Sequence, residues 1–574
     1  MRINDVEQKT GLTQKAIRLY ESKGLVHISR SDNGYRDYSE EDVESLRRIK
    51  LLRETGVSLS DIKLLFGGVT TLEETVQKRK REILGESGKQ SDQYLLCETV
   101  AQRIRGAATE DVARFTEAEE IRPDTHGALA VGLDMGTTTI SAVVLDLDRK
   151  EQLEVYTLPH DSYASSGELS EQRVPDMIDR AERLLHHVAD TYSGIVSIGL
   201  TGQMHGILYV DAQGRPVSHL INWQDKRGDR VLEDGRSTCE MIRCQTGESI
   251  STGYGIATHC YNLRHGLVPP EAVGACSIMD YLGMRLTGRT RALTHASVAA
   301  GFGLFDVREG RFQAEKLTLL GIESDFLPEV TPLTVCLGTW RGIPVSVAIG
   351  DNQASVLGSL GDNDRSILVN VGTGSQISAV SDTCATTSSV ELRPFIEGRY
   401  LTCGSALCGG AAYAMLERFF RSYTTGAGLP ESSQYTVMNA LAREAYAKGE
   451  TELRVDTAFC GKRTDPTCRG SVTGIDDRNF TPGALIVGVL RGICRELSEL
   501  YEAFPQKKTH VVASGGAVRK NEVLRRLIGD QFALPVSVSR VVEEAATGAA
   551  LFSALAVGRV TYRDGFPDYI TYDE

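Results

Sequence analysis

The sequence predicts an α/β protein with two similar lobes, preceded by a small domain rich in helices. Three segments carry this prediction, because each joins a short apolar strand to a glycine-rich turn: residues 129–147, 367–380 and 509–521. The first two turns run into a second strand, and the third runs into a helical pattern. Two distant copies of one hairpin predict two related lobes, and 574 residues are too many for one hydrophobic core.

The composition describes an ordinary globular chain, with 41% hydrophobic and 24% charged residues. A net charge of −13 argues against non-specific nucleic-acid binding by the whole molecule, although a local DNA-binding domain stays open. No segment approaches the ~20 apolar residues of a membrane span, and residues 1–7 lack the apolar core of a signal peptide. The 12 cysteines form no CxxC pair. We therefore expect reduced thiols, no membrane partner and a cytoplasmic location.

The first 66 residues predict a helix-turn-helix followed by a hairpin. Helical patterns at 3–9 and 14–23 flank a glycine turn, and Thr13 can cap the second helix. Asn33-Gly34 lies between two short extended runs, which is a strong hairpin signal. The segment carries 12 Lys and Arg against 11 Asp and Glu, so any DNA binding depends on where the charges lie. A helical protein-interaction module is the alternative.

Residues 71–126 are polar and favour helix, and they predict a linker that includes a possible dimerisation helix. Gly85 and Gly88 interrupt the apolar stripe of that helix.

The first glycine-rich turn has the composition of a phosphate site. Gly136 allows close backbone approach, and Thr137 and Thr138 add hydroxyls beside backbone N–H groups. Asp134, at the end of the strand, could hold Mg²⁺ directly or through water. An ordinary hairpin with a buried aspartate is the alternative.

Three further segments place polar side chains after apolar strands. The loop 202–206 contains His205, which is either a structural histidine or a ligand contact at a strand end. Trp223 lies in a polar loop, a mixture that suits a polyhydroxylated ligand. Asp351 follows a buried strand and begins a helix, so it is either a helix cap or a general base.

These motifs resemble the FGGY carbohydrate kinases of the sugar kinase/Hsp70/actin superfamily, over residues 128–574. The matching motifs are Gly132–Thr138, Gly202–Gly206, Trp223–Arg227, Gly350–Ser355, Asn370–Ser375 and Ser514–Asn521. The resemblance implies a two-lobed actin-like ATPase (ribonuclease H-like) fold, with lobes at 127–366 and 367–574. Within the family the sedoheptulokinases are most similar and the xylulokinases are near neighbours, because Trp-Gln-Asp at 223–225 replaces the Trp-Asn-Asp usual in xylulokinases.

The resemblance also implies an activity and the residues that perform it. ATP would phosphorylate the terminal hydroxyl of a ketose, most simply sedoheptulose to sedoheptulose 7-phosphate, with D-xylulose as the alternative. Asp351 would act as the base and Asp134 would organise Mg²⁺. The implied ATP-binding residues are Thr137, Thr138, Thr373, Gly374, Gly515, Gly516 and Asn521. The implied substrate-binding residues are Gln203, Met204, His205, Trp223, Gln224, Asp225, Asp351 and Asn352.

Residues 1–70 resemble the DNA-binding domain of the MerR transcription regulators, chiefly at 13–25, 33–38 and 56–62. The resemblance implies a recognition helix in the major groove, a wing on the phosphate backbone and a homodimer. The implied DNA-binding residues are Thr13, Gln14, Lys15, Arg18, Tyr20, Arg30, Tyr35 and Arg36.

The whole chain is therefore predicted to be a sugar kinase fused to a DNA-binding regulator. One alternative is a sugar-sensing regulator whose kinase fold binds ligand without turnover. A second is an N-terminal module that no longer binds DNA and only assists dimerisation. The pairing of Asp134 with Asp351 favours an active enzyme, because a sensor needs neither carboxylate.

Overall fold

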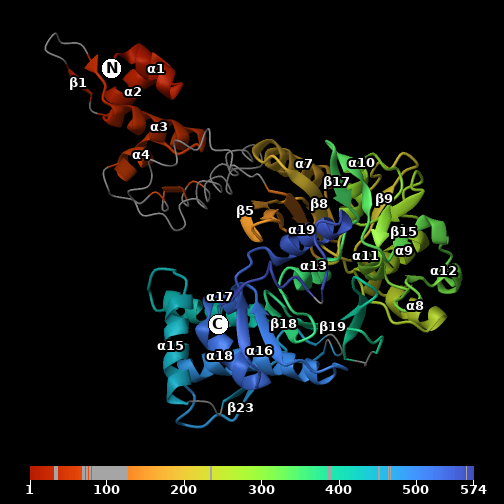
Figure 1. The fold of residues 1–574 in the computed structure, drawn as a ribbon. Helices are drawn as coiled ribbons and strands as arrows, with labels where there is room; N and C mark the ends of the chain where they lie inside the picture. Colours follow the sequence, from red (N-terminus) through yellow and green to blue (C-terminus); the bar gives the residue numbers. More distant parts are fainter. Residues whose placement is uncertain are drawn as a thin grey trace.

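The computed structural model describes residues 1–26, 28–30, 36–66 and 127–573, apart from 233–234, 386–388, 450–452, 463–464, 466 and 564; it also describes 72, 75, 76 and 79. Figure 1 shows a small N-terminal module, in red, beside a larger body with two α/β lobes. The predicted linker at 71–126 lies almost wholly outside the described residues. None of the described helices is long and apolar enough to cross a membrane.

The N-terminal module contains the predicted helix-turn-helix. Its helices are α1 (Ile3–Thr10), α2 (Gln14–Ser22), α3 (Glu40–Glu54) and α4 (Leu59–Phe66). Gly11 ends α1 at a φ of 66°, and the Thr13 hydroxyl accepts a hydrogen bond from the Ala16 N–H at the start of α2. Strands β1 (Ser29–Arg30) and β2 (Arg36–Asp37) pair antiparallel, as the predicted wing requires, while the turn between them lies outside the described residues.

The N-terminal lobe is built on a six-stranded sheet of order β16-β17-β8-β3-β4-β5. The strands are β3 (Leu129–Met135), β4 (Thr139–Asp146), β5 (Glu151–Pro159), β8 (Ile195–Gly202), β16 (Cys336–Trp340) and β17 (Ile343–Ser346). The predicted first hairpin is confirmed as β3 and β4, which pair antiparallel.

The C-terminal lobe has a seven-stranded sheet of order β20-β21-β19-β18-β24-β25-β26. The strands are β18 (Ser366–Val371), β19 (Ser375–Ser381), β20 (Glu391–Pro394), β21 (Tyr400–Ala406), β24 (His510–Ser514), β25 (Val536–Ser539) and β26 (Tyr572–Asp573). The second and third predicted turns therefore join β18 to β19 and follow β24.

The two sheets repeat one pattern. Each has an antiparallel hairpin whose first strand, β3 or β18, also pairs in parallel with a strand that comes later in the chain. That later strand pairs in parallel with another, and an antiparallel strand closes the edge. The predicted pair of similar lobes is therefore confirmed.

Helices cover both sheets. The principal helices of the N-terminal lobe are α7 (Val174–Thr191), α10 (Ile278–Thr287), α11 (Ala296–Ala299) and α13 (Asp351–Leu357). Those of the C-terminal lobe are α14 (Gly410–Gly426), α15 (Tyr435–Lys448), α16 (Pro482–Glu502), α17 (Gly516–Lys520), α18 (Glu522–Phe532) and α19 (Glu544–Ala556). The remaining helices in the first lobe are α8 (Thr238–Thr246), α9 (Gly255–Arg264) and α12 (Ala314–Leu319).

Helix α19 crosses from the end of the chain into the first lobe. It packs on β3, β8 and α13, and Figure 1 shows it in dark blue among the elements of that lobe. Glycines permit the close approach, because a Cβ on Gly132 would lie 1.8 Å from the Ala546 carbonyl oxygen. A Cβ on Gly548 would lie 1.8 Å from that of Ala354 in α13.

Short strands complete the fold around these sheets. Antiparallel partners are β6 (Tyr163–Ser165) with β7 (Glu171–Gln172), β7 with β10 (Leu220–Ile221), β9 (Leu208–Val210) with β11 (Gly274–Cys276), β13 (Phe305–Asp306) with β14 (Arg311–Phe312), and β22 (Arg454–Asp456) with β23 (Ser471–Thr473). β12 (Leu293–His295) pairs in parallel with β15 (Glu329–Thr331).

Candidate functional site

The two predicted catalytic carboxylates lie close together, where the lobes meet. Asp134 is near the end of β3, and Asp351 is the first residue of α13. They are near enough for the charge of Asp351 to raise the pKa of Asp134. The structure thus brings together two residues that are more than 200 positions apart in the chain.

Asp351 is held by backbone N–H groups. Its carboxylate accepts a 2.6 Å hydrogen bond from the Asn352 N–H and another from the Met204 N–H. Burial nevertheless raises the pKa of Asp351 above its ordinary value, while the nearby guanidinium of Arg393 and these N–H donors act in the opposite direction. A desolvated carboxylate held in one orientation has the properties of a general base.

Asp134 is also in an unfavourable place for a negative charge. Burial, followed by the charges of Asp351 and Glu543, raises its pKa to about 8. A divalent cation would relieve this repulsion. A single protein carboxylate, with water and substrate phosphates as the other ligands, is a common way to hold Mg²⁺, and Asp134 is the carboxylate that could serve here.

The turn after Asp134 is braced from the neighbouring loops. The Gln172 side chain donates to the Thr137 carbonyl at 2.9 Å, and the Trp223 indole donates to the Thr137 hydroxyl at 3.0 Å. Thr138 is exposed. Trp223, a predicted substrate contact, is 46% exposed, so its ring is accessible to a ligand.

A cavity of about 600 Å³ takes residues from both lobes, among them Met204 and Arg393, which both interact with Asp351. Met204 and His205 line it, as do Tyr254 and Arg393. His205 adopts a φ of 64°, hydrogen-bonds the Gly301 carbonyl through Nδ1 and lies 4.2 Å, centroid to centroid, from the Tyr254 ring. The left-handed backbone of His205 thus places its ring in the cavity wall, while Nδ1 is bonded to the protein.

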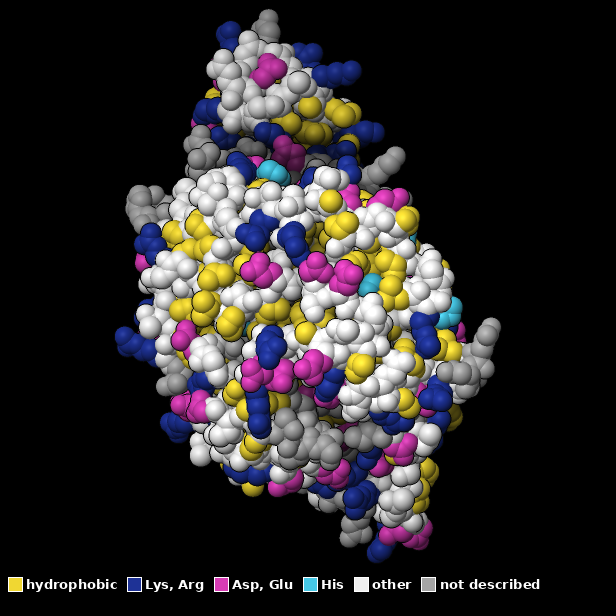
Figure 2. Space-filling view, turned by 90° about the vertical axis from the view of Figure 1, so that its right-hand side faces the viewer, with side chains coloured by type: hydrophobic (Ala, Val, Ile, Leu, Met, Phe, Trp, Pro, Cys, Tyr) yellow, Lys and Arg dark blue, Asp and Glu magenta, His cyan; other side chains and the backbone are white. Residues whose placement is uncertain are grey.

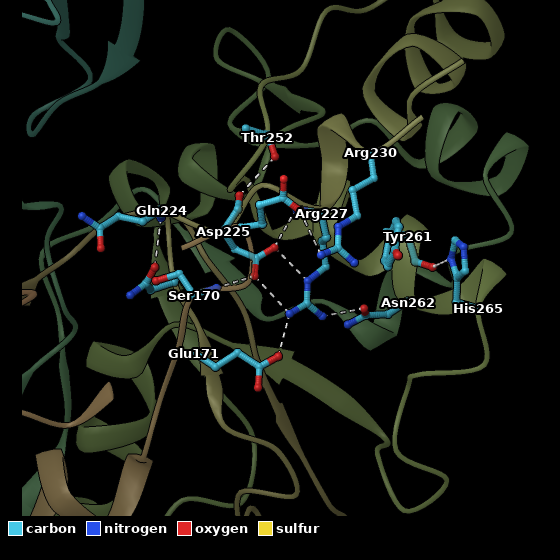
Figure 3. A network of polar contacts seen from close by, with 12 residues as sticks. Ser170, Glu171, Gln224, Asp225, Arg227, Arg230, Thr252, Tyr261, Asn262 and His265 are labelled. Carbon is cyan, nitrogen blue, oxygen red and sulfur yellow. Dashed lines mark hydrogen bonds and ion pairs between the residues drawn. The ribbon is translucent and has the colours of Figure 1, made fainter. Parts of the chain in front are cut away.

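Asp225, another predicted sugar contact, points into the protein interior instead. Asp225 is fully buried, and it accepts hydrogen bonds from the Ser170 N–H at 2.9 Å and the Arg227 side chain at 2.8 Å. Figure 3 shows this pair with Asn262 and Glu171 closing around the guanidinium. The structure therefore does not bring Asp225 to the cavity, because Arg227, two residues later, is bonded to its carboxylate, and its role as a sugar contact stays a prediction.

Gln203, Gln224 and Asn352 are likewise engaged with protein. Gln203 donates to the Gln172 side chain at 2.9 Å, and Gln224 accepts from the Tyr163 hydroxyl at 2.7 Å. The Asn352 amide donates to the Gln376 side chain in the other lobe at 2.7 Å. None of the three lines the 600 Å³ cavity.

A second cavity, of about 480 Å³, lies in the C-terminal lobe between the two other glycine-rich turns. Thr373, Gly516 and Asn521 line it, so three of the predicted ATP-binding residues share one space. Gly515 adjoins this cavity and adopts a φ of 95°. A Cβ at this position would lie 2.6 Å from the Val371 carbonyl oxygen, so the position requires glycine. Gly374 closes the neighbouring turn, where the Gly409 and Ala411 N–H groups bond the Thr373 carbonyl.

Several lining residues carry no motif and were missed. Tyr413, Tyr435 and Asn439, on α14 and α15, form one wall of the second cavity. The two tyrosine rings stack at 5.8 Å, and the Tyr413 hydroxyl donates to Asn439. An apolar, aromatic wall opposite a glycine-rich turn suits a nucleoside, but helical periodicity alone cannot separate such a wall from core.

The predicted DNA-contacting helix has one exposed basic face. Lys15 and Arg18 lie three positions apart on α2 and are exposed. Tyr20 is 8% exposed and packs in the core of the module, so it does not lie on this exposed face and its DNA contact stays a prediction. Gln14 bonds Asn4 and Glu7 on α1, and Thr13 caps α2.

The described part of the wing includes the side chain of one of its three predicted DNA contacts, Arg36. Arg36 forms a 2.7 Å ion pair with Glu21. Tyr35 and the side chain of Arg30 fall outside the described residues. Figure 2 shows Lys and Arg side chains projecting from the N-terminal module, while acidic and basic groups alternate over the visible face of the body.

Comparison with known families divides the chain in the same way. Residues 129–367 match the FGGY family of carbohydrate kinases, N-terminal domain, and residues 367–557 match its C-terminal domain. Residues 1–68 match the MerR HTH family regulatory protein.

Individual relatives match over nearly their whole length. The sedoheptulokinase of Mus musculus is 28% identical over 470 residues, which cover 74% of this chain and 96% of that protein. The human sedoheptulokinase is 27% identical over 476 residues, with the same two shares. A glycerol kinase from Trichlorobacter lovleyi is 28% identical over 462 residues, 75% of this chain and 90% of its own.

Solved structures show the same fold. A gluconate kinase from Lactobacillus acidophilus has a TM-score of 0.69 at 20% identity, covering 78% of this chain and 93% of that one. A ligand-bound xylulose kinase from the same organism has a TM-score of 0.68 at 20% identity, with the same coverage.

Proposed function

Because this chain belongs to the FGGY family of carbohydrate kinases, and is an ATP-dependent sugar kinase, we propose that its substrate is the ketose sedoheptulose, phosphorylated at the terminal hydroxyl. The observation that carries the proposal is that the Met204 loop links the base to the 600 Å³ cavity. The Met204 N–H donates to the Asp351 carboxylate, and Met204 also lines that cavity. The two sedoheptulokinase relatives support the seven-carbon sugar. D-xylulose is the second candidate.

In the proposed reaction, Asp351 accepts the proton of the sugar's terminal hydroxyl as the hydroxyl oxygen attacks the γ-phosphorus of ATP. The bond from that phosphorus to the β,γ-bridging oxygen breaks, and ADP leaves. Thr137, Thr138 and Thr373 bind the phosphates, while Gly516 and Asn521 bind the nucleoside. Positioning supplies most of the rate enhancement, because the chemistry needs little more than alignment and charge stabilisation.

Asp134 would hold Mg²⁺, which fits the raised pKa of this carboxyl group, because a bound cation would offset the charges of Asp351 and Glu543. The metal supplies charge neutralisation for the transferring phosphoryl group. Asp134 would supply one carboxylate ligand to this metal from the end of β3.

The test is product formation from ATP with a panel of sugars: sedoheptulose, D-xylulose, glycerol and gluconate. Sedoheptulose should give the highest kcat/KM, and D-xylulose should follow. A higher kcat/KM with glycerol or gluconate would overturn the substrate assignment. A saturable sugar complex without turnover would favour the second candidate function, a sugar-sensing regulator.

The N-terminal module is proposed to bind double-stranded DNA, so that the occupancy of the kinase site regulates transcription. The exposed Lys15 and Arg18 on α2 support this role, as does the match to the MerR family. A homodimer is proposed for the bound form, because a two-fold DNA site is read by a two-fold protein.

A further inference from the structure

Arg393 is a buried cation in the wall of the 600 Å³ cavity. It lies on β20, the edge strand of the C-terminal sheet, and only 9% of the residue is exposed. The other side of the cavity, with His205 and Tyr254, belongs to the N-terminal lobe. Arg393 therefore reaches the proposed sugar site from the lobe that otherwise binds the nucleotide.

The position of Arg393 relative to Asp351 is fixed by hydrogen bonds between α13 and the C-terminal sheet. The Gln353 side chain donates to the Pro394 carbonyl at 2.9 Å, directly beside Arg393. The Asn352 side chain donates to Gln376 on β19 at 2.7 Å. Asn352 and Gln353 follow Asp351 in α13, so these hydrogen bonds fix the distance between the Asp351 carboxylate and the Arg393 guanidinium.

Only part of the hydrogen-bonding capacity of the Arg393 guanidinium is used by the described residues. Its Nε and Nη2 atoms both donate to one oxygen of Glu391, at 3.1 and 2.6 Å. Within the described part of the chain, Nη1 has no hydrogen-bond acceptor. The guanidinium carries five N–H donors, and because Arg393 lines the cavity, those of Nη1 can bond a ligand there. A cavity ligand rich in hydroxyl oxygens would supply what the protein does not.

We propose that Arg393 is a substrate-binding residue whose Nη1 donates to the sugar hydroxyl next to the one that is phosphorylated. This assignment rests on the proposed function, because Asp351 must engage the terminal hydroxyl. For sedoheptulose the adjacent group is the C6 hydroxyl. The strand β20 thereby selects sugars that carry an oxygen at that carbon.

The electrostatics agree with this placement. Asp351 faces Arg393 on β20, Asp134 on β3 and Cys403 on β21. Arg393 is the cation among these neighbours, and it lowers the pKa of Asp351 against the effect of burial. The same guanidinium can thus order the substrate and favour the ionised base.

The test is a double-mutant-type cycle, in which the affinities of two sugars for two proteins are measured by calorimetry without ATP. The sugars are sedoheptulose and 6-deoxysedoheptulose, and the proteins are the wild type and Arg393→Gln. The wild type should bind the deoxy sugar about 10- to 100-fold more weakly, as for a hydrogen bond to a charged group. Arg393→Gln should weaken sedoheptulose binding by the same factor and should barely distinguish the two sugars.

Arg399→Gln is the matched control. Arg399 lies in the connection that follows β20, and the side chains of both arginines are 10% exposed. Arg399 instead pairs with Asp364 and Asp382, away from the cavity. It should leave both sugar affinities unchanged. Arg393→Lys keeps the charge, and should retain part of the discrimination if the glutamine variant fails to fold.

The outcomes separate this inference from the kinase assignment. An unchanged preference for the C6 hydroxyl in Arg393→Gln overturns the role of Arg393, even if turnover continues. Binding without phosphorylation in the wild type defeats the proposed reaction but leaves the binding cycle decisive. A wild type that binds neither sedoheptulose nor D-xylulose overturns both proposals.

Discussion

Single residues set the chemistry at the junction of the lobes. Asp351 gains two backbone donors because the Met204 loop and the first turn of α13 meet at its carboxylate. That arrangement predicts a defined result for Asp351→Asn: kcat should fall by about 10²- to 10⁴-fold, since a general base is lost while the amide keeps a similar shape.

The measurement is ATP consumption with sedoheptulose, with sugar binding followed in parallel. Asp477→Asn is the control, because its side chain is 95% exposed. Near-normal turnover in Asp351→Asn would rule out the base assignment.

His295 is a second residue with a testable role. It is fully buried, and burial lowers its pKa to about 4. Its Nδ1 accepts from the Ser297 N–H, and the Ser297 hydroxyl accepts from the Gly350 N–H, beside Asp351. Protonation of His295 at low pH should therefore weaken the hydrogen bonds that link His295, Ser297 and Gly350.

The pKa of His295 is lower in the folded than in the unfolded protein. Its contribution to the free energy of unfolding is therefore fully present above about pH 6.5 and is lost as the pH falls toward 4. The free energy of unfolding should fall by up to about 1.4 kcal/mol per pH unit from this group. His295→Asn keeps a helix-capping acceptor and does not titrate, so its urea midpoint should fall less between pH 7 and 5. Parallel pH profiles for the two proteins would exclude this role of His295.

Among the elements, α19 depends on glycine for its place. Gly548→Ala would push a methyl group against the Ala354 carbonyl of α13, where 1.8 Å is available. Overpacking of this kind should cost about 1–3 kcal/mol and lower the unfolding midpoint. Gly426→Ala, at the end of α14 with nothing within 4 Å, should cost nothing. Equal midpoints for the two variants would show that α13 and α19 can move apart freely.

The sequence predicted those elements whose signals are local. The β3–β4 hairpin agrees within two residues of each boundary, since apolar runs and a glycine turn determine it. The ion pair of Asp225 with Arg227 could not be predicted, because a polar loop does not reveal which carboxylate its own arginine will bond. Arg393 and the packing of α19 were invisible, because their partners are distant in sequence and no motif marks a buried arginine or a glycine contact.

At the scale of the whole molecule, the basic face of α2 should act separately from the sugar site. Lys15→Ala with Arg18→Ala should weaken DNA binding and make its salt dependence shallower, since two phosphate or base contacts would be lost. Kinase activity should stay unchanged. Duplexes selected from a random library by the wild type, tested by gel shift at two salt concentrations, supply the measurement.

Lys507→Ala, in the C-terminal lobe, removes a positive charge elsewhere and is the control. If the α2 double variant and Lys507→Ala bound the selected duplex as tightly as the wild type, the DNA-binding proposal would fail.

The crossing of α19 into the first lobe also bears on how the chain is made. During translation β3 leaves the ribosome roughly 400 residues before α19, a delay on the order of 20–80 s at typical synthesis rates. Throughout that interval the face of β3 and β8 that α19 covers has no covering helix. The first lobe is therefore completed only by the last part of the chain. A nascent chain halted before residue 544 should recruit chaperones, and release of the finished chain should be the step that lets both lobes fold.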